Sequence, residues 1–283
     1  DATPFADQLV LDFALNLLQA EQLGTDSQTD LLSVSFSAMD YVGHAPGHDT
    51  QQMHATVLSI DEKVGILIDA AVKQAGRGKV LVVFTADHGV SPVPEENIAR
   101  KMPGGRYNQA AERAAVEAAL SAGFGPGTYV EGAADASLYL KAQPIAGKHI
   151  NHSEMESLAA QTLRAMPHVA RVYTRTELLS SHTGGDRIDQ RVRNGFSPLH
   201  SADVIVVHDP YWLSEGSGTT HGSPYSYDTH VPVIFWGSGS LIRAGQYHQD
   251  AGVQDIAPTL STLLGIAAPS GATGRVLAEI IPE

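Results

Sequence analysis

Apolar positions in the first hundred residues alternate between a helical spacing and short continuous runs. Repeats of three and four residues predict one helix between Pro4 and Gly24 and another over about 51–75. The runs LLSVSFS (31–37) and VLVVFTA (80–86) predict strands. Helices that alternate with strands in this way are typical of a parallel sheet with crossover helices. The apolar stripe expected to face the core from the first helix is Phe5, Leu9, Val10, Phe13, Leu17 and Leu18.

The pattern changes over 103–199, where polar helices and short strands have a periodicity of their own. We therefore expect a small inserted α+β subdomain there, and an α/β core made of 1–102 and 200–283. The core pattern resumes with ADVIVVH and VPVIFWG, which are continuously apolar, as strands covered on both faces should be. The strands expected in the main sheet are 31–37, 80–86, 203–208 and 231–236.

Charge and cysteine content narrow the classes of function. The 283 residues contain 18 Lys and Arg against 31 Asp and Glu, a net charge of −13, which argues against a nucleic-acid-binding surface. An acidic chain can still bind a small anionic substrate, because metal ions reverse the local field. The chain has no cysteine, so a metal must be held by Asp, Glu and His, which favours zinc, manganese or magnesium.

Neither a membrane span nor a leader is evident. No apolar run reaches the ~18 residues that a bilayer-spanning helix needs. The sequence begins at Asp1 with neither Met nor a signal-like segment, so we expect that an upstream segment has been removed.

Acids and imidazoles follow the predicted strands. Asp40 and His44 come four residues apart after the first strand, and Asp87 and His88 follow the second. Ligands bind at the carboxyl ends of the strands in open parallel sheets, so these pairs are expected to gather at one edge, with His221 brought in by a loop. Asp228 and His230 stand further along the same loop.

Each of these residues also has a structural interpretation. Asp87 after a strand is commonly a turn former or a helix cap, and a lone His44 or His221 commonly makes hydrogen bonds in a loop. Neighbouring carboxylates, however, are costly to bury unless cations compensate them. From spacing alone, a divalent-metal site and a purely structural role both remain open.

The strings DYVGH, TADHG and THGSPYSYDTHVP together resemble the alkaline phosphatase superfamily. The similarity is closest to secreted bacterial alkaline phosphatases with a threonine nucleophile, relatives of the nucleotide pyrophosphatase/phosphodiesterases. It covers roughly 3–95 and 200–283, including DIAPTLSTLLGI near the end. The resemblance implies a doubly wound, mostly parallel α/β sheet with helices on both faces, two Zn²⁺ ions and a periplasmic or secreted location.

The resemblance also implies roles for single residues. Asp40, His44 and His221 would hold one zinc, and Asp87 and His88 would be ligands of the other. In the family, a hydroxyl nucleophile on the second zinc attacks phosphorus and forms a covalent phospho-enzyme. The residues expected around the metals without coordinating them are His48, Thr85, Asp228 and His230. His48 is a departure, since the family usually has Gly-Pro where this chain has Gly47-His48.

Other parts of the family's site have no counterpart in this sequence. A further metal-binding Asp, the Thr nucleophile and the Lys and Arg groups that hold phosphate are expected in an N-terminal part, which would be the partner of this chain. The internal hydroxyls Thr85, Thr219 and Thr220 are expected to be structural. The predicted function is hydrolysis of phosphate monoesters, favoured by PYSYDTHVP. The alternatives are a phosphodiesterase or nucleotide pyrophosphatase, or a catalytically silent metal-binding fragment.

Overall fold

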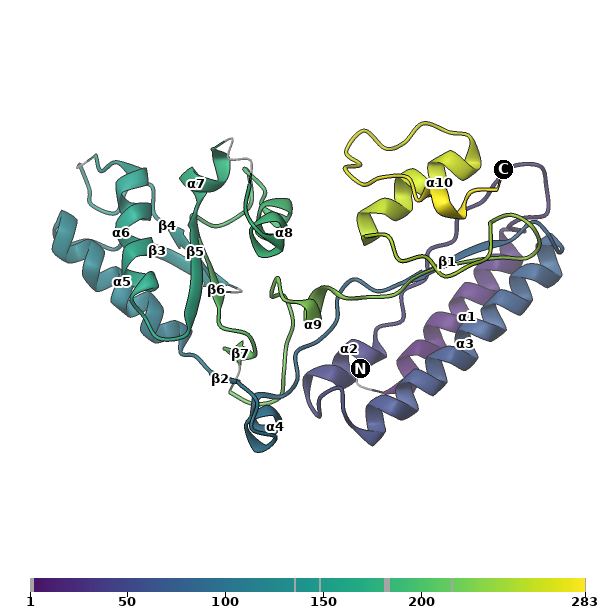
Figure 1. The fold of residues 1–283 in the computed structure, drawn as a ribbon, viewed down its shortest axis with the longest axis horizontal. Helices are drawn as coiled ribbons and strands as arrows, with labels where there is room; N and C mark the ends of the chain where they lie inside the picture. Colours follow the sequence, from purple (N-terminus) through teal and green to yellow (C-terminus); the bar gives the residue numbers. More distant parts are fainter. Residues whose placement is uncertain (1–2, 135, 148, 181–183, 215, 283) are drawn as a thin grey trace. The chain divides into compact units, whose positions relative to one another are not determined.

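The computed structural model describes residues 3–134, 136–147, 149–180, 184–214 and 216–282. The chain divides into two compact units, drawn in Figure 1, each with its own helices and strands. The first unit comprises 1–89 and 230–283, and the second comprises 90–229. No helix among the described residues is both long and apolar enough to cross a bilayer.

The first unit is built on a pair of long helices, α1 and α3, which lie side by side (Figure 1). Thr50 begins α3, because its side chain accepts a hydrogen bond from the Met53 amide at 3.2 Å. A two-stranded antiparallel sheet pairs β1 with β8, in a register that places Val83 opposite Phe235. The elements of this unit are α1 (Pro4–Ala20), α2 (Ala38–His44), α3 (Gln51–Ala75), β1 (Leu81–Thr85), β8 (Val233–Gly237), η1 (Val253–Asp255), α10 (Ile256–Leu264) and η2 (Ala278–Ile280).

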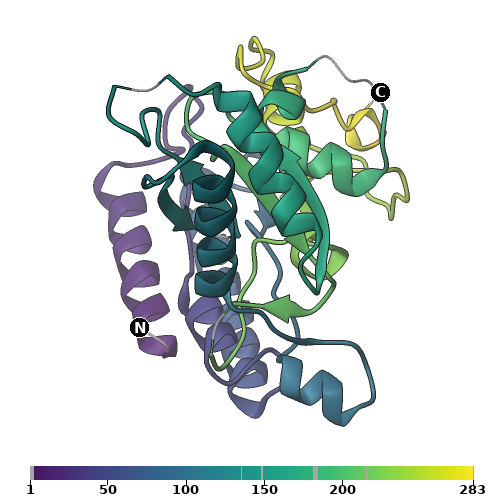
Figure 2. The same ribbon diagram turned by 90° about the vertical axis from the view of Figure 1, so that its left-hand side faces the viewer.

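The second unit is a four-stranded antiparallel sheet in the order β3-β4-β6-β5, with α5 and α6 packed side by side against it (Figure 2). A short parallel pairing joins β2 to β7. Its elements are α4 (Pro94–Ala99), β2 (Gly105–Arg106), α5 (Gln109–Phe124), β3 (Val130–Ala134), β4 (Ser137–Leu140), α6 (His152–Arg164), β5 (Val169–Thr174), α7 (Arg175–Leu179), α8 (Arg187–Gly195), β6 (Val204–His208), β7 (Trp212–Leu213) and α9 (Ser226–Thr229).

The second unit contains the hydrophobic core cluster of the described residues. Helices α5 and α6 contribute side chains that are fully buried, and the strands supply the facing layer. Fully burying a Val, Leu or Met side chain stabilises the fold by roughly 1.5–3 kcal/mol. The cluster is Val116, Leu120, Tyr129, Val130, Leu138, Leu140, Ile150, Met155, Ala159, Ala160, Leu163, Val172, Val204 and Val206.

The fold mixes helices and sheets as the α/β class requires, but the strand-level prediction was wrong in three respects. Residues 31–37 alternate in exposure, yet they form no strand and pair with none among the described residues. Residues 204–208 form β6 in the second unit, so that unit is larger than the predicted insert, and β1 and β8 pair antiparallel. The physical reason is that an apolar run predicts a buried strand but does not identify the strand it pairs with. That pairing, and whether it is parallel or antiparallel, depends on contacts distant in the sequence.

The C-terminal segment returns to α10. Gly265 ends α10 in the left-handed region with φ +67°, which favours glycine. The Leu277 amide donates to the Thr259 hydroxyl at 2.9 Å. Arg275 forms two hydrogen bonds to the Glu279 carboxylate, at 2.7 and 3.0 Å. This hydrogen bonding lowers the pKa of Glu279 to about 2 from the ordinary 4.5.

Stability is therefore expected to depend on the ionisation of Glu279. Because its pKa is depressed in the folded state, its contribution is present in full above about pH 4.5 and is lost as the pH falls towards about 2. We expect Glu279→Gln to be less stable than the unaltered chain at neutral pH, with the difference disappearing across that window. Urea unfolding at a series of pH values measures it, and a difference independent of pH would contradict the assignment.

Candidate metal centre

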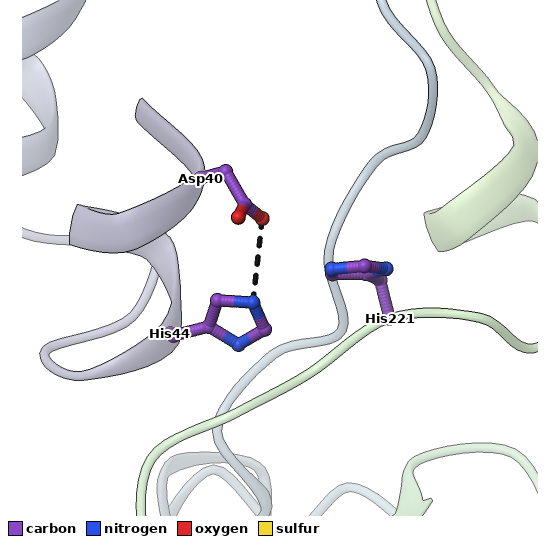
Figure 3. A group of neighbouring side chains, drawn as sticks. All are labelled: Asp40, His44 and His221. Atoms are coloured by element: carbon purple, nitrogen blue, oxygen red, sulfur yellow. Dashed lines mark ion pairs between the residues drawn. The ribbon is translucent and has the colours of Figure 1, made fainter. Parts of the chain in front are cut away.

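Helix α2 carries two of the predicted ligands on one turn. Asp40 and His44 are four residues apart, so both side chains project from the same face of the helix. His44 Nε2 lies 3.4 Å from Asp40 Oδ1, the interaction dashed in Figure 3. Both side chains are partly exposed, at 40% for Asp40 and 37% for His44, which leaves them accessible to an ion.

The end of β1 supplies the second pair, as the sequence predicted from strand ends. His88 Nε2 lies 3.5 Å from Asp87 Oδ2 and 3.9 Å from Asp40 Oδ1. On the other side of its ring, His88 Nδ1 lies 2.8 Å from the Gly89 carbonyl oxygen, which orients the imidazole. Asp40 is thus the residue that touches both imidazoles, and four predicted ligands of the first unit are gathered together.

The spacing of the ligand atoms within each pair fits one zinc ion per pair. Two ligand atoms about 2.1 Å from a tetrahedral zinc are about 3.4 Å apart. The Asp40–His44 and Asp87–His88 separations, 3.4 and 3.5 Å, match that distance. Carboxylate oxygen and imidazole nitrogen are also the donors that zinc accepts in a chain without cysteine. The donor set therefore fits the metal that the family resemblance implies.

Asp7 positions α2, a role that was not predicted from the sequence. The residue lies on α1 and is 1% exposed, and its Oδ1 accepts a hydrogen bond from the Ala38 amide, at 3.1 Å, at the first residue of α2. Ser37, the residue before α2, makes no side-chain cap of its own. The cap is supplied from 31 residues away in sequence, so no local pattern reveals it. The one feature of the sequence that could have indicated this role is that Asp7 is an acid on the same helical stripe as the apolar Leu11, and both are buried.

Removing that cap should destabilise the first unit. We expect Asp7→Ala to lower the free energy of unfolding by about 1–2 kcal/mol, the usual cost of losing a helix cap. The chain has two tryptophans, and Trp236 lies in the first unit, so its fluorescence in a Trp212→Phe background follows that unit during urea unfolding. The matched control is Asp12→Ala on the exposed face of the same helix, and equal midpoints for the two variants would refute the capping role.

His221 lies in the second unit, in a loop that is anchored at both ends; Figure 3 also draws this side chain. Before it, the buried Thr219 hydroxyl donates to the Ser91 carbonyl at 2.6 Å, so Thr219 is structural as expected. After it, Asp228 Oδ2 accepts from the Ser223 amide at 2.7 Å and the Ser223 hydroxyl at 2.6 Å. Asp228 therefore holds the loop at Ser223, two residues beyond His221.

The other residues expected around the metals are on the surface. His48, Thr85 and His230 are all exposed, and the Thr85 hydroxyl lies 3.4 Å from the Ala86 carbonyl oxygen. Tyr225, in the loop after His221, donates its hydroxyl to the His208 carbonyl at 2.7 Å. Burial raises the pKa of Tyr225 to about 12, so it remains a neutral donor at ordinary pH. Tyr225, four residues after His221, therefore has a structural role.

Comparison with known proteins shows which family the chain matches. The family model described as type I phosphodiesterase / nucleotide pyrophosphatase matches residues 2–231. The chain is 32% identical over 281 residues to "Alkaline phosphatase PafA" of Elizabethkingia meningoseptica, covering 99% of this chain and 51% of that protein. It is 31% identical to "Alkaline phosphatase PhoK" of Sphingomonas sp, covering 94% of this chain and 49% of that protein. The chain thus spans about half the length of the curated relatives it matches.

Solved structures agree with that similarity. The crystal structure of wild-type alkaline phosphatase PafA superposes with a TM-score of 0.90 at 32% identity, covering 99% of this chain and 53% of the other. Murine ectonucleotide pyrophosphatase / phosphodiesterase 5 superposes with a TM-score of 0.56 at 17% identity, covering 93% of this chain and 60% of the other. The first comparison confirms the alkaline-phosphatase-like α/β fold, and the second supports the fold alone.

Proposed function

Because the chain belongs to the type I phosphodiesterase / nucleotide pyrophosphatase family, within the alkaline phosphatase superfamily, we propose that it forms the zinc-binding half of a phosphate monoesterase. The observation that carries the proposal is the gathering of Asp40 and His44 of α2 with His88, which follows β1, at separations of 3.4 and 3.9 Å from Asp40. The names of the bacterial relatives favour monoesters over diesters.

Two zinc ions are proposed, held by residues of this chain and of its partner. Asp40, His44 and His221 would hold one ion, with His221 assigned from its motif, and Asp87 and His88 would bind the second. When bound, the ions would offset the charge of the phosphate and lower the pKa of the oxygen nucleophile. Asp40 and Asp87 supply the negative charge that retains the cations, and His88 keeps its orientation through the Gly89 carbonyl.

The nucleophile, a further Asp ligand and the cationic phosphate-binding groups are proposed to come from the half of the relatives that this chain does not match. The chain alone would then bind zinc and turn over no ester. A periplasmic or secreted location belongs to the same proposal, since it follows from the bacterial relatives.

Zinc binding and ester hydrolysis test the proposal separately. Calorimetric titration of the chain should give zinc binding that His221→Ala weakens and that Asp87→Asn, at the incomplete second position, alters less. With p-nitrophenyl phosphate, the pure chain should be inactive with and without zinc. Hydrolysis that is lost on chelation would place the nucleophile in this chain. Zinc binding no stronger than that of a variant lacking both Asp40 and His44 would refute the metal assignment.

A diesterase remains the second candidate, because the matching family model names phosphodiesterases. Joined to the complementary half, a monoesterase should hydrolyse p-nitrophenyl phosphate faster than bis-p-nitrophenyl phosphate. The reverse preference would favour the diesterase.

A further inference from the structure

A histidine and two carboxylates meet in the second unit, in a group that shares no residue with the predicted zinc ligands. His152 and Glu156 are four residues apart on α6, which packs against β6 (Figure 1), and Asp203 directly precedes β6. His152 Nε2 lies 3.2 Å from Asp203 Oδ1 and 3.9 Å from Glu156 Oε1. The three residues offer one ligand atom each, and these atoms all lie within 4.8 Å of one another. Three donors of the kinds that zinc accepts are therefore gathered in one place.

Each of the two carboxylates is held by a backbone amide that leaves its other oxygen beside His152. Glu156 Oε2 accepts from the Thr176 amide at 2.9 Å, and Asp203 Oδ2 accepts from the Leu140 amide at 2.7 Å. The oxygens that lie nearest to the imidazole are the remaining ones, Oε1 and Oδ1. Carboxylates that bind metal ions are commonly oriented by hydrogen bonds of this kind. The two donor oxygens are therefore fixed by the fold itself.

The group carries more buried negative charge than its neighbours neutralise. Glu156 and Asp203 are 2% and 8% exposed. The Arg175 guanidinium donates to Asp203 Oδ1 at 3.0 Å, and its other donors are used by two backbone carbonyl oxygens. Glu156 has its one ion pair within the described part of the chain with His152, and its Oε1 accepts no hydrogen bond from those residues. A buried carboxylate is costly unless a cation compensates it, so this site favours a positive ligand.

We propose that His152, Glu156 and Asp203 bind a divalent cation such as zinc. Their separations of 3.2 and 3.9 Å bracket the distance of about 3.4 Å between two ligand atoms of a tetrahedral zinc. The His152 side chain is 37% exposed, which gives an ion access from solvent. Once bound, the ion would tie α6 to the start of β6 and stabilise the second unit. The proposal depends neither on the phosphatase activity nor on the zinc ligands proposed above.

Urea unfolding of the second unit in the presence of zinc tests the site. The protein is the full chain with Asp40→Ala and His44→Ala, which remove the first proposed site. Trp236→Phe is added so that Trp212 fluorescence follows the second unit. We expect saturating zinc to raise the unfolding midpoint and a chelator to reverse the shift, because an ion that binds only the folded state stabilises it.

Two further changes in that chain test the ligands. His152→Ala and Glu156→Gln should each abolish the zinc-dependent shift and weaken zinc binding at least about tenfold, measured with a competing chromogenic chelator. Glu156→Gln keeps an oxygen for the Thr176 amide, so this variant should unfold cooperatively without zinc. Asp203 stays unaltered, because its removal would also leave Arg175 without its carboxylate.

His168→Ala is the matched control, because His168 lies at the same 3.2 Å from a carboxylate, that of Asp209, and that is its one ion pair in the described part of the chain. His168 stacks on Trp212, so its zinc affinity is compared and its fluorescence is not. The control should bind zinc as tightly as the chain with His168 intact.

Three results would overturn the proposal. The first is an unfolding midpoint of the second unit that zinc does not change. The second is zinc affinity in His152→Ala and Glu156→Gln equal to that of the chain without these changes. The third is an equal loss of affinity in His168→Ala. Because Asp40 and His44 are replaced in every protein compared, these results are independent of the first proposed site and of ester hydrolysis.

Discussion

Asp40→Asn is expected to weaken zinc binding at both proposed positions by roughly 100-fold or more, since even groups that only orient a ligand are worth about 10- to 100-fold. The reason is its position. Asp40 Oδ1 lies 3.4 Å from His44 Nε2 and 3.9 Å from His88 Nε2, so one carboxylate adjoins both histidines. Removing its charge therefore takes an anionic donor from one ion and a compensating charge from the other.

The comparison with neighbouring variants makes this expectation specific. His44→Ala should affect the first ion only, and Asp87→Asn should affect the second only. Asp61→Asn, an exposed acid on α3, removes one charge of the same unit without touching the cluster and should leave zinc affinity unchanged. Titration with a competing chromogenic chelator measures each affinity.

Two outcomes would contradict the interpretation. If Asp40→Asn weakens binding no more than Asp61→Asn, only the net charge of the chain matters and the cluster is not a zinc site. If Asp40→Asn and His44→Ala have the same effect and Asp87→Asn has none, the chain binds a single ion. The second proposed position would then depend entirely on the missing partner.

The sequence predicted elements better than their partners. The run ADVIVVH correctly predicted a buried strand, because continuous apolarity reports burial on two faces. It did not show that β6 pairs with β4 and β5 in the second unit, since the same burial is reached in either sheet. For 31–37 the alternation of Leu, Val and Phe with Ser predicted a strand, and the exposure of these residues does alternate, but no strand forms there among the described residues. A strand also needs a neighbouring edge, which its own residues cannot encode.

The same limit applies to helix α1. Its apolar spacing predicted a helix, but the six residues expected to face the core include Phe5, Leu9 and Phe13, which are exposed. The buried stripe instead contains Asp7 together with Leu11. Periodicity predicts the helix, but when apolar residues lie on two sides it does not show which side packs against the rest of the unit.

The candidate site was predictable to the extent that its residues are local. Asp40 with His44 and Asp87 with His88 are pairs separated by no more than four residues. Asp87 and His88 follow β1 as predicted, whereas Asp40 and His44 lie on α2, after a segment that forms no strand among the described residues. Asp7 bonds to the start of α2 across 31 residues, and Thr219 bonds to Ser91 across 128, so neither contact follows from a local sequence pattern. Whether His221 joins Asp40 and His44 stays a prediction, to be decided by the zinc affinity of His221→Ala.

The second large effect is expected at Asp203, in the interior of the second unit. The Asp203 side chain is 12% exposed, and its Oδ2 accepts from the Leu140 amide at 2.7 Å. Its Oδ1 accepts from Arg175 Nε at 3.0 Å and lies 3.2 Å from His152 Nε2. Arg175 also donates to the Pro198 and Ser201 carbonyl oxygens, in the segment before β6. The Asp203 carboxylate therefore neutralises a guanidinium that holds this segment in place.

Asp203→Ala should therefore destabilise the second unit by about 3–5 kcal/mol, the usual cost of removing one partner from a buried ion pair. The variant leaves the Arg175 charge without its carboxylate and the Leu140 amide without its acceptor. Asp203→Asn preserves shape and one acceptor, so we expect a smaller loss. In a Trp236→Phe background, Trp212 fluorescence reports urea unfolding of this unit alone.

Asp209 provides the matched control, because it lies at the same 3.2 Å from a histidine as Asp203 does. The His168–Asp209 pair is exposed, at 42% and 45%, so Asp209→Ala should cost less than about 1 kcal/mol. The distance is equal in the two pairs and only burial and the number of partners differ. If Asp203→Ala and Asp209→Ala shift the unfolding midpoint equally, Asp203 is not the centre of the network that joins β4, α6 and β6.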